Sequence, residues 1–192
     1  MTVERDSSLA DLAQRALAGD GAALDDLLRA LEPLVVRTTR LVVGSGSWAA
    51  EDAAQEALLD VARGIATLRD PEAVQAWALR IATTRAIKVA RRERLNALEQ
   101  QAIPGPELHA DPGDARAAAL KDAFDELPPR LRATAVLRLH VGLSETETAQ
   151  VLGCAVGTVK SNLHDARIRL THVLAERGFA PVVPLKRLEE SA

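Results

Sequence analysis

The sequence predicts an all-α protein made of two small helical domains joined by a flexible linker. Alanine and leucine dominate the 192 residues, tyrosine is absent, and aromatic residues make up only 2%. Strands draw on aromatic and β-branched residues, whereas alanine and leucine favour helices, so this composition favours packed helices. Hydrophobic residues make up 47% of the chain, which is enough to build buried cores.

Turn-forming residues divide the first half of the chain into four predicted helices. Glycine, serine, aspartate and proline gather at residues 19–21, 44–47 and 69–71, where they stop one helix and cap the next. These four helices form a first domain, which we expect to span residues 8–98. Their expected ranges are residues 8–18, 21–43, 48–64 and 71–98.

The character of the sequence changes after the fourth helix. Residues 103–114 contain three prolines and two glycines without any apolar period, which is typical of a semi-extended linker. We place this linker at residues 99–114, a second domain at residues 115–177 and a loosely held tail at residues 178–192. Helices of the second domain are expected at residues 115–127, 129–141, 144–152 and 156–177.

The last two predicted helices are separated by a tight turn. Ala149 and Leu152 share one helical face, and Gly153 can adopt the left-handed conformation that ends a helix. Val156 and Val159 then restart the apolar stripe. Two short helices crossing at such a turn form a helix-turn-helix, whose second helix enters the major groove of DNA.

Polar and basic residues occupy the outward part of this second helix. Hydroxyls and amines near the start of a reading helix reach base edges, and cations further along reach phosphates. The other interpretation is an ordinary solvated face on a terminal helix. The residues concerned are Thr158, Lys160, Ser161, His164 and Arg167.

The first domain carries an acidic-polar edge. Asp52, Gln55 and Glu56 stand at i, i+3 and i+4, so they share one face of a helix. Such an edge suits contact with a basic protein partner, although a solvated face gives the same pattern.

A positively charged cluster follows in the fourth helix. It sets six cations against the single Glu93, in a chain whose net charge is −3. A one-sided cluster in an otherwise acidic chain predicts a phosphate track. Trp77 lies near it, and we consider two roles for this side chain: an aromatic anchor of the core, or a platform for base stacking. The six cations are Arg80, Arg85, Lys88, Arg91, Arg92 and Arg94.

The sequence lacks a convergent set of catalytic residues. It has no glycine-elbow serine and no phosphate-binding glycine loop. The spacing of His140, Cys154 and His164 matches no common zinc pattern, and we expect Cys154 to be a small buried hydrophobe in the turn. We therefore predict a protein that is not an enzyme, with no catalytic residue, no metal and no cofactor.

Cysteine content and hydropathy predict a cytoplasmic protein. The single cysteine cannot form an intramolecular disulfide, and the polar N-terminus shows no secretion signal. The uninterrupted apolar stretches fall short of the ~20 residues that span a bilayer, so we expect no membrane insertion.

Taken together, the two domains resemble bacterial sigma factors of the extracytoplasmic-function (ECF) type in the sigma-70 family, which keep only a region 2 and a region 4. The resemblance covers about Leu9 to Leu174. It rests on motifs in a fixed order: residues 18–20, 50–56, 76–82, 127–132, 142–144 and 156–161.

This resemblance implies a transcription initiation factor that binds core RNA polymerase, directs it to specific promoters and aids promoter melting. Asp52, Gln55 and Glu56 match the face that docks on the coiled coil of the polymerase clamp. The helix from Val156, including Gly157, matches the reader of the −35 element, and the linker matches a segment that runs toward the RNA exit path. An anti-sigma factor is a further implied partner. The residues implied at the −10 element are Trp77, Arg80, Thr84, Arg85, Lys88, Arg91 and Arg92.

Two other functions remain open from the residues alone. A stand-alone helix-turn-helix regulator would bind DNA without polymerase, typically as a dimer on a palindrome. A sigma-like interaction protein with reduced promoter activity is the second. It is kept open because Asn162 and Asp165 stand where the family commonly has arginines, and Ala155 replaces the usual serine cap.

Overall fold

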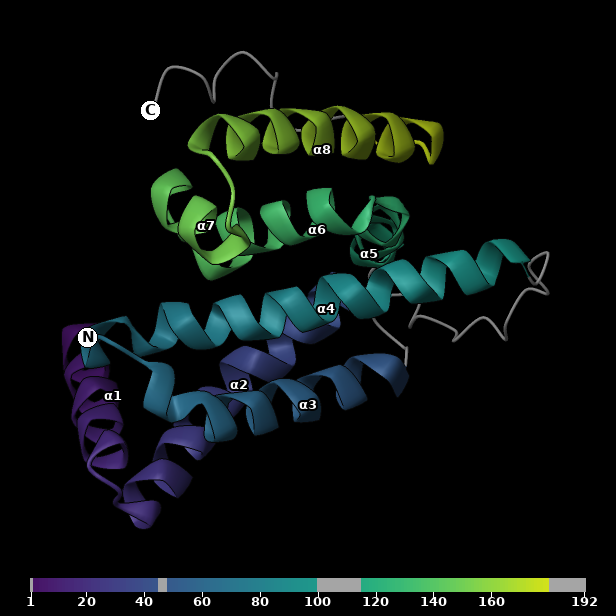
Figure 1. Cartoon of the computed structure of the whole chain (residues 1–192). Coiled ribbons are helices and arrows are strands. Elements are labelled where there is room, and N and C mark those ends of the chain that lie inside the picture. The colour runs from purple at the N-terminus through teal and green to yellow at the C-terminus, as the bar shows by residue number, and fades with distance from the viewer. Residues whose placement is uncertain (1, 45–47, 100–114, 180–192) are drawn as a thin grey trace.

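The computed structural model describes residues 2–44, 48–99 and 115–179, and these are helical throughout apart from short turns (Figure 1). The predicted all-α class is thereby confirmed for the described residues. Most of the predicted linker and tail, residues 100–114 and 180–192, lies outside them. Among the described helices, none combines the length and hydrophobicity needed to cross a membrane.

The helices follow the sequence boundaries closely. The elements are α1 (Thr2–Leu17), α2 (Gly21–Val43), α3 (Trp48–Gly64), the 3₁₀ turns η1 (Ile65–Thr67) and η2 (Pro71–Ala73), α4 (Val74–Glu99), α5 (Ala115–Glu126), α6 (Pro129–Ala135), the π-helical turn η4 (Val136–Val141), α7 (Glu145–Leu152) and α8 (Val156–Glu176).

Three expected boundaries were wrong. The first helix begins at Thr2, before the expected start at residue 8. The fourth opens with the 3₁₀ turn η2, where Asp70 accepts a hydrogen bond from the Glu72 N–H at 3.0 Å and Pro71 occupies the first position. The helix expected at residues 129–141 widens into the π-helical turn η4 before Gly142 ends it with a left-handed φ of 84°.

Helices α1 to α4 surround one apolar core. Its centre is formed by Leu27 and Leu31 of α2, Val61 of α3 and Ala78 of α4, each at most 1% exposed. The spacing of Leu27, Leu31 and Val35 keeps one stripe of α2 facing this core. Helix α2 begins cleanly because the Asp20 carboxylate accepts a hydrogen bond from the Ala23 N–H at 3.0 Å.

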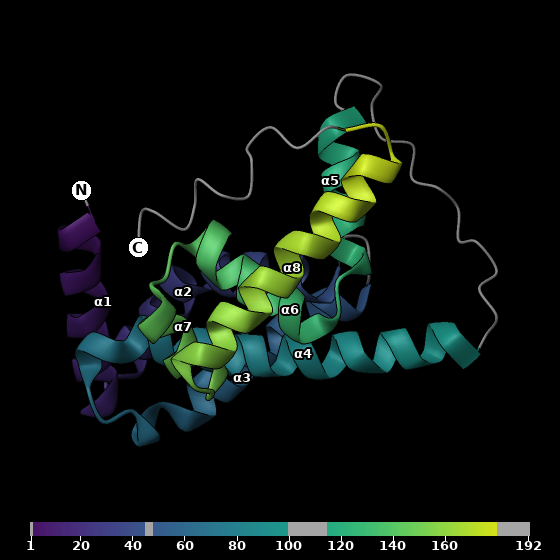
Figure 2. The same cartoon turned by 90° about the horizontal axis from the view of Figure 1, so that it is seen from above.

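Helices α5 to α8 form the second domain. Leu127 and Leu131 pack with Ala166 and Leu170 of α8, so α8 is held along its inner side by α5 and α6. Figure 2 shows α8 lying over α6, at an angle to α4.

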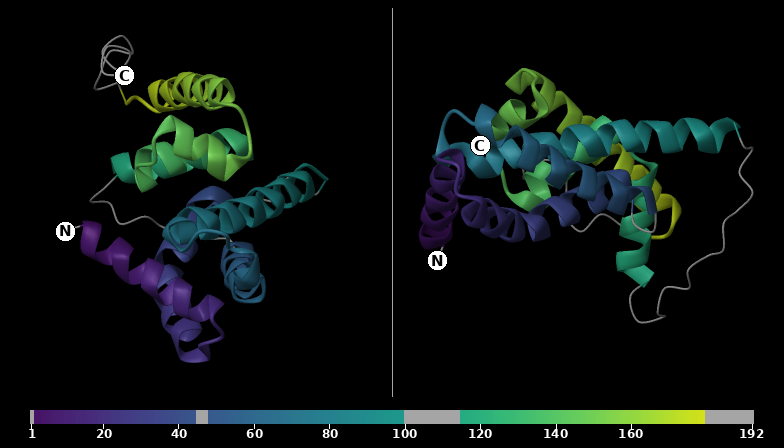
Figure 3. Two further views of the ribbon diagram at one scale, coloured as in Figure 1. Left: turned by 60° about the vertical axis from the view of Figure 1, so that its left-hand side comes forward. Right: turned by 60° about the horizontal axis from the view of Figure 1, so that its bottom comes forward.

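The two domains pack against each other through α4. In the left view of Figure 3 they form two layers, with α5 to α8 on one side and α1 to α4 on the other. Helices α6 and α7 both contact α4, and α6 also contacts α2. The sequence had indicated two domains but not this contact.

Candidate nucleic-acid interface

The helix-turn-helix begins with a capping box on α7. The Ser144 hydroxyl accepts a hydrogen bond from the Glu147 N–H at 3.2 Å, and the Glu147 carboxylate accepts one from the Ser144 N–H at 2.7 Å. Gly153 ends the helix with φ 62°, and the Cys154 N–H returns to the Ala149 carbonyl at 3.0 Å. These contacts fix the turn that aims the next helix.

Replacing Ser144→Ala should lower the free energy of unfolding by about 1 kcal/mol, because a helix N-cap is lost. The Ser144 hydrogen bonds lower the pKa of Glu147 below its usual value. A lowered carboxyl pKa stabilises the fold above the pKa of the unfolded chain, and this contribution disappears as the pH falls through the lowered pKa. Part of the wild-type advantage should therefore vanish below about pH 4.

Thermal unfolding of Ser144→Ala beside Thr146→Ala, at pH 7 and in acid, tests this expectation. Thr146 is an exposed residue of the same helix and serves as the matched control. Equal melting temperatures for the two variants at pH 7 would show that the box contributes nothing.

The reader helix α8 exposes most of the residues expected to contact DNA. Gly157, Thr158, Lys160, Ser161 and His164 are exposed. The remaining residue, Arg167, is half-buried. The reader helix starts without a side-chain cap at Ala155, as the sequence indicated.

Two side chains restrain this helix. The Lys160 ammonium lies 3.5 Å from the Glu145 carboxylate of α7. Asn162 is half-buried, and its amide donates a hydrogen bond to the Thr134 hydroxyl of α6 at 3.3 Å. Asn162 therefore fastens α8 to α6.

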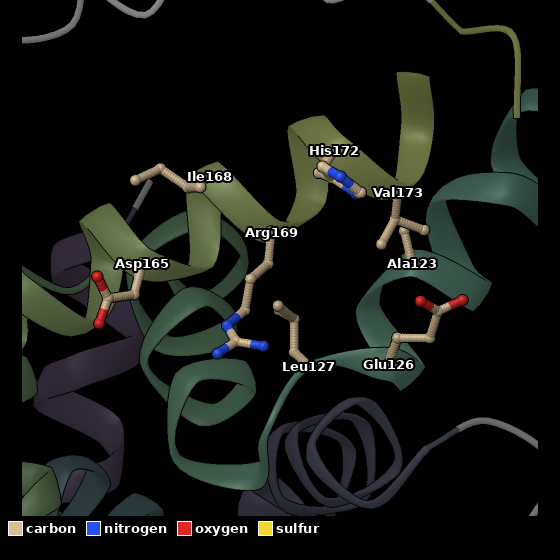
Figure 4. A pocket seen from close by; sticks show the side chains of 8 residues that line it. All are labelled: Ala123, Glu126, Leu127, Asp165, Ile168, Arg169, His172 and Val173. Atoms are coloured by element: carbon tan, nitrogen blue, oxygen red, sulfur yellow. The ribbon is translucent and has the colours of Figure 1, made fainter. Parts of the chain in front are cut away.

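Asp165 is exposed and belongs to a different surface. Figure 4 shows it with Arg169 and His172 along α8, opposite Glu126 of α5, around a hollow of about 550 Å³. His172 lies 3.4 Å from Glu176. This hollow lies on the α5 side of α8.

Cys154 is only half-buried, so the expectation of a buried hydrophobe was wrong. It lies in the turn between α7 and α8 beside a shallow hollow that Ala155 and Val156 also line. The turn lies at the surface, which leaves the thiol partly accessible.

The acidic-polar edge is presented on α3. Asp52, Gln55 and Glu56 are all exposed, while Ala53 and Ala57 on the opposite side are buried in the core. Helical spacing places the polar residues and the alanines on opposite faces of α3. The small alanine side chains allow α3 to pack closely on α2 and α4.

The basic track on α4 is mostly exposed. Its cations Arg80, Lys88, Arg91, Arg92 and Arg94 face solvent, and Thr84 is exposed among them. The Thr84 hydroxyl is already used, because it donates to the Arg80 carbonyl at 2.7 Å. The five exposed cations are therefore available for the expected phosphate contacts.

Arg85 differs from its neighbours on the track. Its guanidinium lies 2.6 Å from the Asp60 carboxylate and 3.3 Å from that of Glu56, both on α3. Arg85 thus joins the acidic edge to the basic track, and its charge is balanced within the domain. Asp60 was not predicted to belong to this edge, although its i+4 spacing from Glu56 places the two carboxylates on one face of the helix.

Trp77 has the contacts of a core anchor, one of the two roles considered for it. It packs against the core of the first domain, and its ring covers Gly64, where an added Cβ would lie 3.4 Å from the indole. The same ring lines a hollow of about 300 Å³ between α3 and α4, together with Arg80 and Arg85. An aromatic ring beside two cations suits an unstacked base and its phosphates.

A second basic crevice lies between the domains. It has a volume of about 430 Å³, with Lys88, Arg91 and Arg92 of α4 and Arg130 of α6 on its lining. Apolar residues that include Leu152 of α7 complete it. Helix α7 therefore borders the basic track.

Sequence patterns did not identify Arg132 of α6 as a buried residue. In the structure its side chain is only 7% exposed. It donates hydrogen bonds to the carbonyls of Val43 at 2.9 Å and Leu127 at 3.1 Å, and to the Asp125 backbone carbonyl. It also lies 3.3 Å from the Asp125 carboxylate. Burial lowers the pKa of this guanidinium, while Asp125 opposes that effect. No local pattern distinguishes Arg132 from the exposed Arg130.

Comparisons with known proteins match both domains. The family model described as sigma-70 region 2 matches residues 27–95, and the one described as sigma-70 region 4 matches residues 117–170. The ECF RNA polymerase sigma factor SigM of Mycobacterium tuberculosis is 34% identical over 167 residues, which cover 87% of this chain and 85% of the relative. ShbA of Streptomyces griseus, another ECF sigma factor, is 31% identical over 86% of this chain and 94% of its own.

Solved structures share the fold. The structure of CnrH with the cytosolic domain of CnrY aligns with a TM-score of 0.66 at 23% identity, over 88% of this chain and 98% of the other. RpoE of Bartonella quintana, solved with the anti-sigma factor NepR, aligns with a TM-score of 0.62 at 24% identity, over 79% of this chain and 96% of the other.

Proposed function

This chain belongs to the sigma-70 family of RNA polymerase sigma factors, in its ECF type, and on that premise we propose which of its surfaces carry the family's function. As a sigma factor it binds core RNA polymerase and directs it to specific promoters. The comparisons support this function over a stand-alone regulator, because both sigma regions are matched in order.

The acidic-polar edge of α3 is proposed as the polymerase-docking surface. Asp52, Gln55 and Glu56 are exposed together on one face, so a basic coiled coil can contact all three at once. The buried alanines behind them hold this face rigid, which limits the entropy lost on docking.

The Trp77 hollow and the basic track are proposed as the −10 surface. The ring of Trp77 receives an unstacked base, while the cations of α4 neutralise the phosphates beside it. The cations assigned to this role are Arg80, Lys88, Arg91 and Arg92, with Arg85 contributing from its pairing with α3 and Thr84 lying among them.

The exposed start of α8 is proposed as the −35 reader. Thr158, Lys160 and Ser161 lie where base edges are reached, and His164 and Arg167 lie further along for phosphates. Gly157 has nothing near the position of an added Cβ, so it gives DNA close access to the backbone.

The domain assignment follows these surfaces. Residues 8–98 act on polymerase and the −10 element, residues 115–177 on the −35 element, residues 99–114 as the linker and residues 178–192 as the tail. The chain itself performs no catalysis, since polymerase carries out the chemistry, and it works in the cytoplasm. An anti-sigma factor is a proposed regulator, because RpoE of similar fold is solved with one.

The observation that carries this proposal is the presence of a docking edge on α3, a basic track on α4 and a reader helix, α8, in one chain. Mapping of transcription start sites after overexpression will identify the promoter sequence. Run-off transcription from that promoter with purified core enzyme will then test the proposed function. Transcription should depend on the added chain. Failure to bind core enzyme would refute the proposal, and binding without transcription would favour the sigma-like interaction protein instead.

The double variant Arg91→Gln/Arg92→Gln should weaken promoter binding by the holoenzyme. Two phosphate contacts are lost, so a plot of log affinity against log salt should flatten by about 1.5 in slope. The matched control is Arg29→Gln/Arg37→Gln on α2, which removes the same two positive charges at a site away from the basic track. An unchanged slope for the first variant would remove these arginines from the interface.

A further inference from the structure

The basic crevice between the domains brings four cations together. Lys88, Arg91 and Arg92 share one face of α4, because they stand at i, i+3 and i+4. Arg130 joins them from α6, so the cations come from two helices. Among the described residues that line the crevice, none carries a carboxylate. The crevice is therefore a positively charged hollow of about 430 Å³.

These four cations have no protein partner within residues 2–44, 48–99 and 115–179. Other guanidiniums of the chain pair with a carboxylate, as Arg85 does with Asp60 at 2.6 Å and Arg177 with Glu126 at 2.7 Å. Two of the crevice cations also stand one helical turn apart on α4, where like charges repel each other. An anion that bound in the crevice would relieve this repulsion and supply the missing partner.

A buried hydroxyl without a partner belongs to the same crevice. Thr83 of α4 is 1% exposed and lines the crevice, and its Oγ1 has no hydrogen-bond partner among the described residues. Its neighbour Thr84 is satisfied, because that hydroxyl donates to the Arg80 carbonyl one turn earlier at 2.7 Å. Buried polar groups are nearly always hydrogen-bonded, so a ligand with oxygen atoms would satisfy Thr83 here.

Apolar residues complete the lining. Ile87 and Leu95 come from α4, and Leu152 comes from α7. Val151 of α7 also lines the crevice and packs with Leu79 of α4 in an apolar cluster shared by the two domains, which fixes α7 beside α4. Ligand pockets typically have volumes of about 300–1,000 Å³ and combine apolar side chains with a few polar groups. The crevice has both properties.

We propose that this crevice binds a nucleoside polyphosphate. A chain of three phosphates carries about four negative charges at neutral pH, which matches the four cations. The guanidiniums hold phosphate oxygens in pairs, and Lys88 adds a point charge. The nucleoside packs on the apolar residues. Among the described lining residues, none has a side-chain amide or carboxylate to read a base edge, so adenine and guanine nucleotides bind alike.

The nucleotide site shares three cations with the proposed −10 surface, and this consequence rests on the proposed function. A bound nucleotide neutralises Lys88, Arg91 and Arg92, so it competes with promoter phosphates for α4. Arg130 and Leu152 separate the two sites, because α6 and α7 lie outside the basic track. The occupied factor therefore binds promoter DNA more weakly.

Isothermal titration calorimetry on the full chain, without polymerase or DNA, tests the site. ATP should bind one to one with a Kd below about 100 µM, and GTP should match it within about threefold. Tripolyphosphate should bind at least about fivefold more weakly than ATP, because it buries no apolar surface. Adenosine should not bind. Absence of ATP binding would overturn the proposal, and equal affinity for tripolyphosphate would overturn the assignment of a nucleoside.

Two variants alter the crevice from opposite domains. Arg130→Gln removes the cation of α6, and Thr83→Val removes the unpartnered hydroxyl while keeping the shape of the side chain. Each should weaken ATP binding at least about fivefold. Without ATP, Thr83→Val should melt no lower than wild type, because the hydroxyl that it removes has no partner in the chain. Arg94→Gln is the matched control, since Arg94 is an exposed cation of α4 outside the crevice lining.

The possible failures are distinguishable. Equal weakening by Arg94→Gln and Arg130→Gln would reduce the effect to overall charge and overturn the site. Holoenzyme carrying Arg130→Gln should bind a single-stranded oligonucleotide of the mapped −10 sequence within about twofold of wild type. A loss as large as that for ATP would assign the crevice to DNA instead. Calorimetry needs neither DNA nor polymerase, so absence of run-off transcription would refute the proposed function while ATP binding would still show the nucleotide site.

Discussion

Asp52→Ala/Gln55→Ala should reduce affinity for core RNA polymerase by at least about 100-fold, equivalent to roughly 2.7 kcal/mol. Both side chains are exposed on the same face of α3, and anchors near the centre of an interface commonly contribute 2 kcal/mol or more. Neither side chain packs in the core, so helicity should stay at the wild-type level. Run-off transcription should fall in parallel with binding, because the variant no longer recruits polymerase.

The chain offers a closely matched control for this variant. Asp11 and Gln14 on α1 have the same residue types, the same i, i+3 spacing and the same exposed setting. Asp11→Ala/Gln14→Ala should therefore retain affinity for core enzyme. Equal losses in both double variants would indicate a general effect of charge. Loss of helicity in Asp52→Ala/Gln55→Ala would show instead that these residues are structural.

Arg132→Met should lower the free energy of unfolding by about 3 kcal/mol. Methionine keeps much of the buried stem but leaves three backbone carbonyls without their donor and the Asp125 carboxylate without its cation. In a chain of this size, a loss of that magnitude lowers the melting temperature by roughly 6 to 12 °C.

Differential scanning calorimetry of Arg132→Met beside Arg130→Met tests the burial argument. Arg130 belongs to the same helix and carries the same charge, but it is exposed, so its loss should change stability by no more than about 0.5 kcal/mol. Comparable melting temperatures in the two variants would mean that the Arg132 hydrogen bonds contribute little net stability.

Local signals explain why so many helix boundaries could be predicted. Helix α2 begins after Asp20 and ends before Gly44 as expected, because a capping carboxylate and a glycine with positive φ act within a few residues. The expected start of the first helix was wrong, since the polar residues before Leu9 carry no apolar period and the prediction depended on that period. The π-helical turn η4 was also not predictable, because it depends on how Val136 and Leu137 pack against the first domain.

The candidate surfaces, too, were predictable from the sequence only in part. Exposure of Asp52, Gln55 and Glu56 follows from helical spacing, so the sequence was sufficient to place them on one face. The pairing of Arg85 with Asp60 depends on how α4 crosses α3, and the inward position of Asn162 depends on α6. The charge of Arg85 indicated a phosphate contact, and packing gave both Arg85 and Asn162 a protein partner.

The sequence by itself determined the all-α class, most helix ends, the helix-turn-helix and the order of sigma motifs, because each depends on residues close together in the chain. Only the tertiary structure decided that the two domains share apolar clusters, that Arg132 is buried against the carbonyl of Val43, and that α7 lies between the two proposed DNA surfaces. The hydrogen bond from Arg132 to Val43 alone joins residues 89 positions apart. Their energies come from burial of complementary surfaces, and no short pattern in the sequence records which distant surface will cover a given side chain.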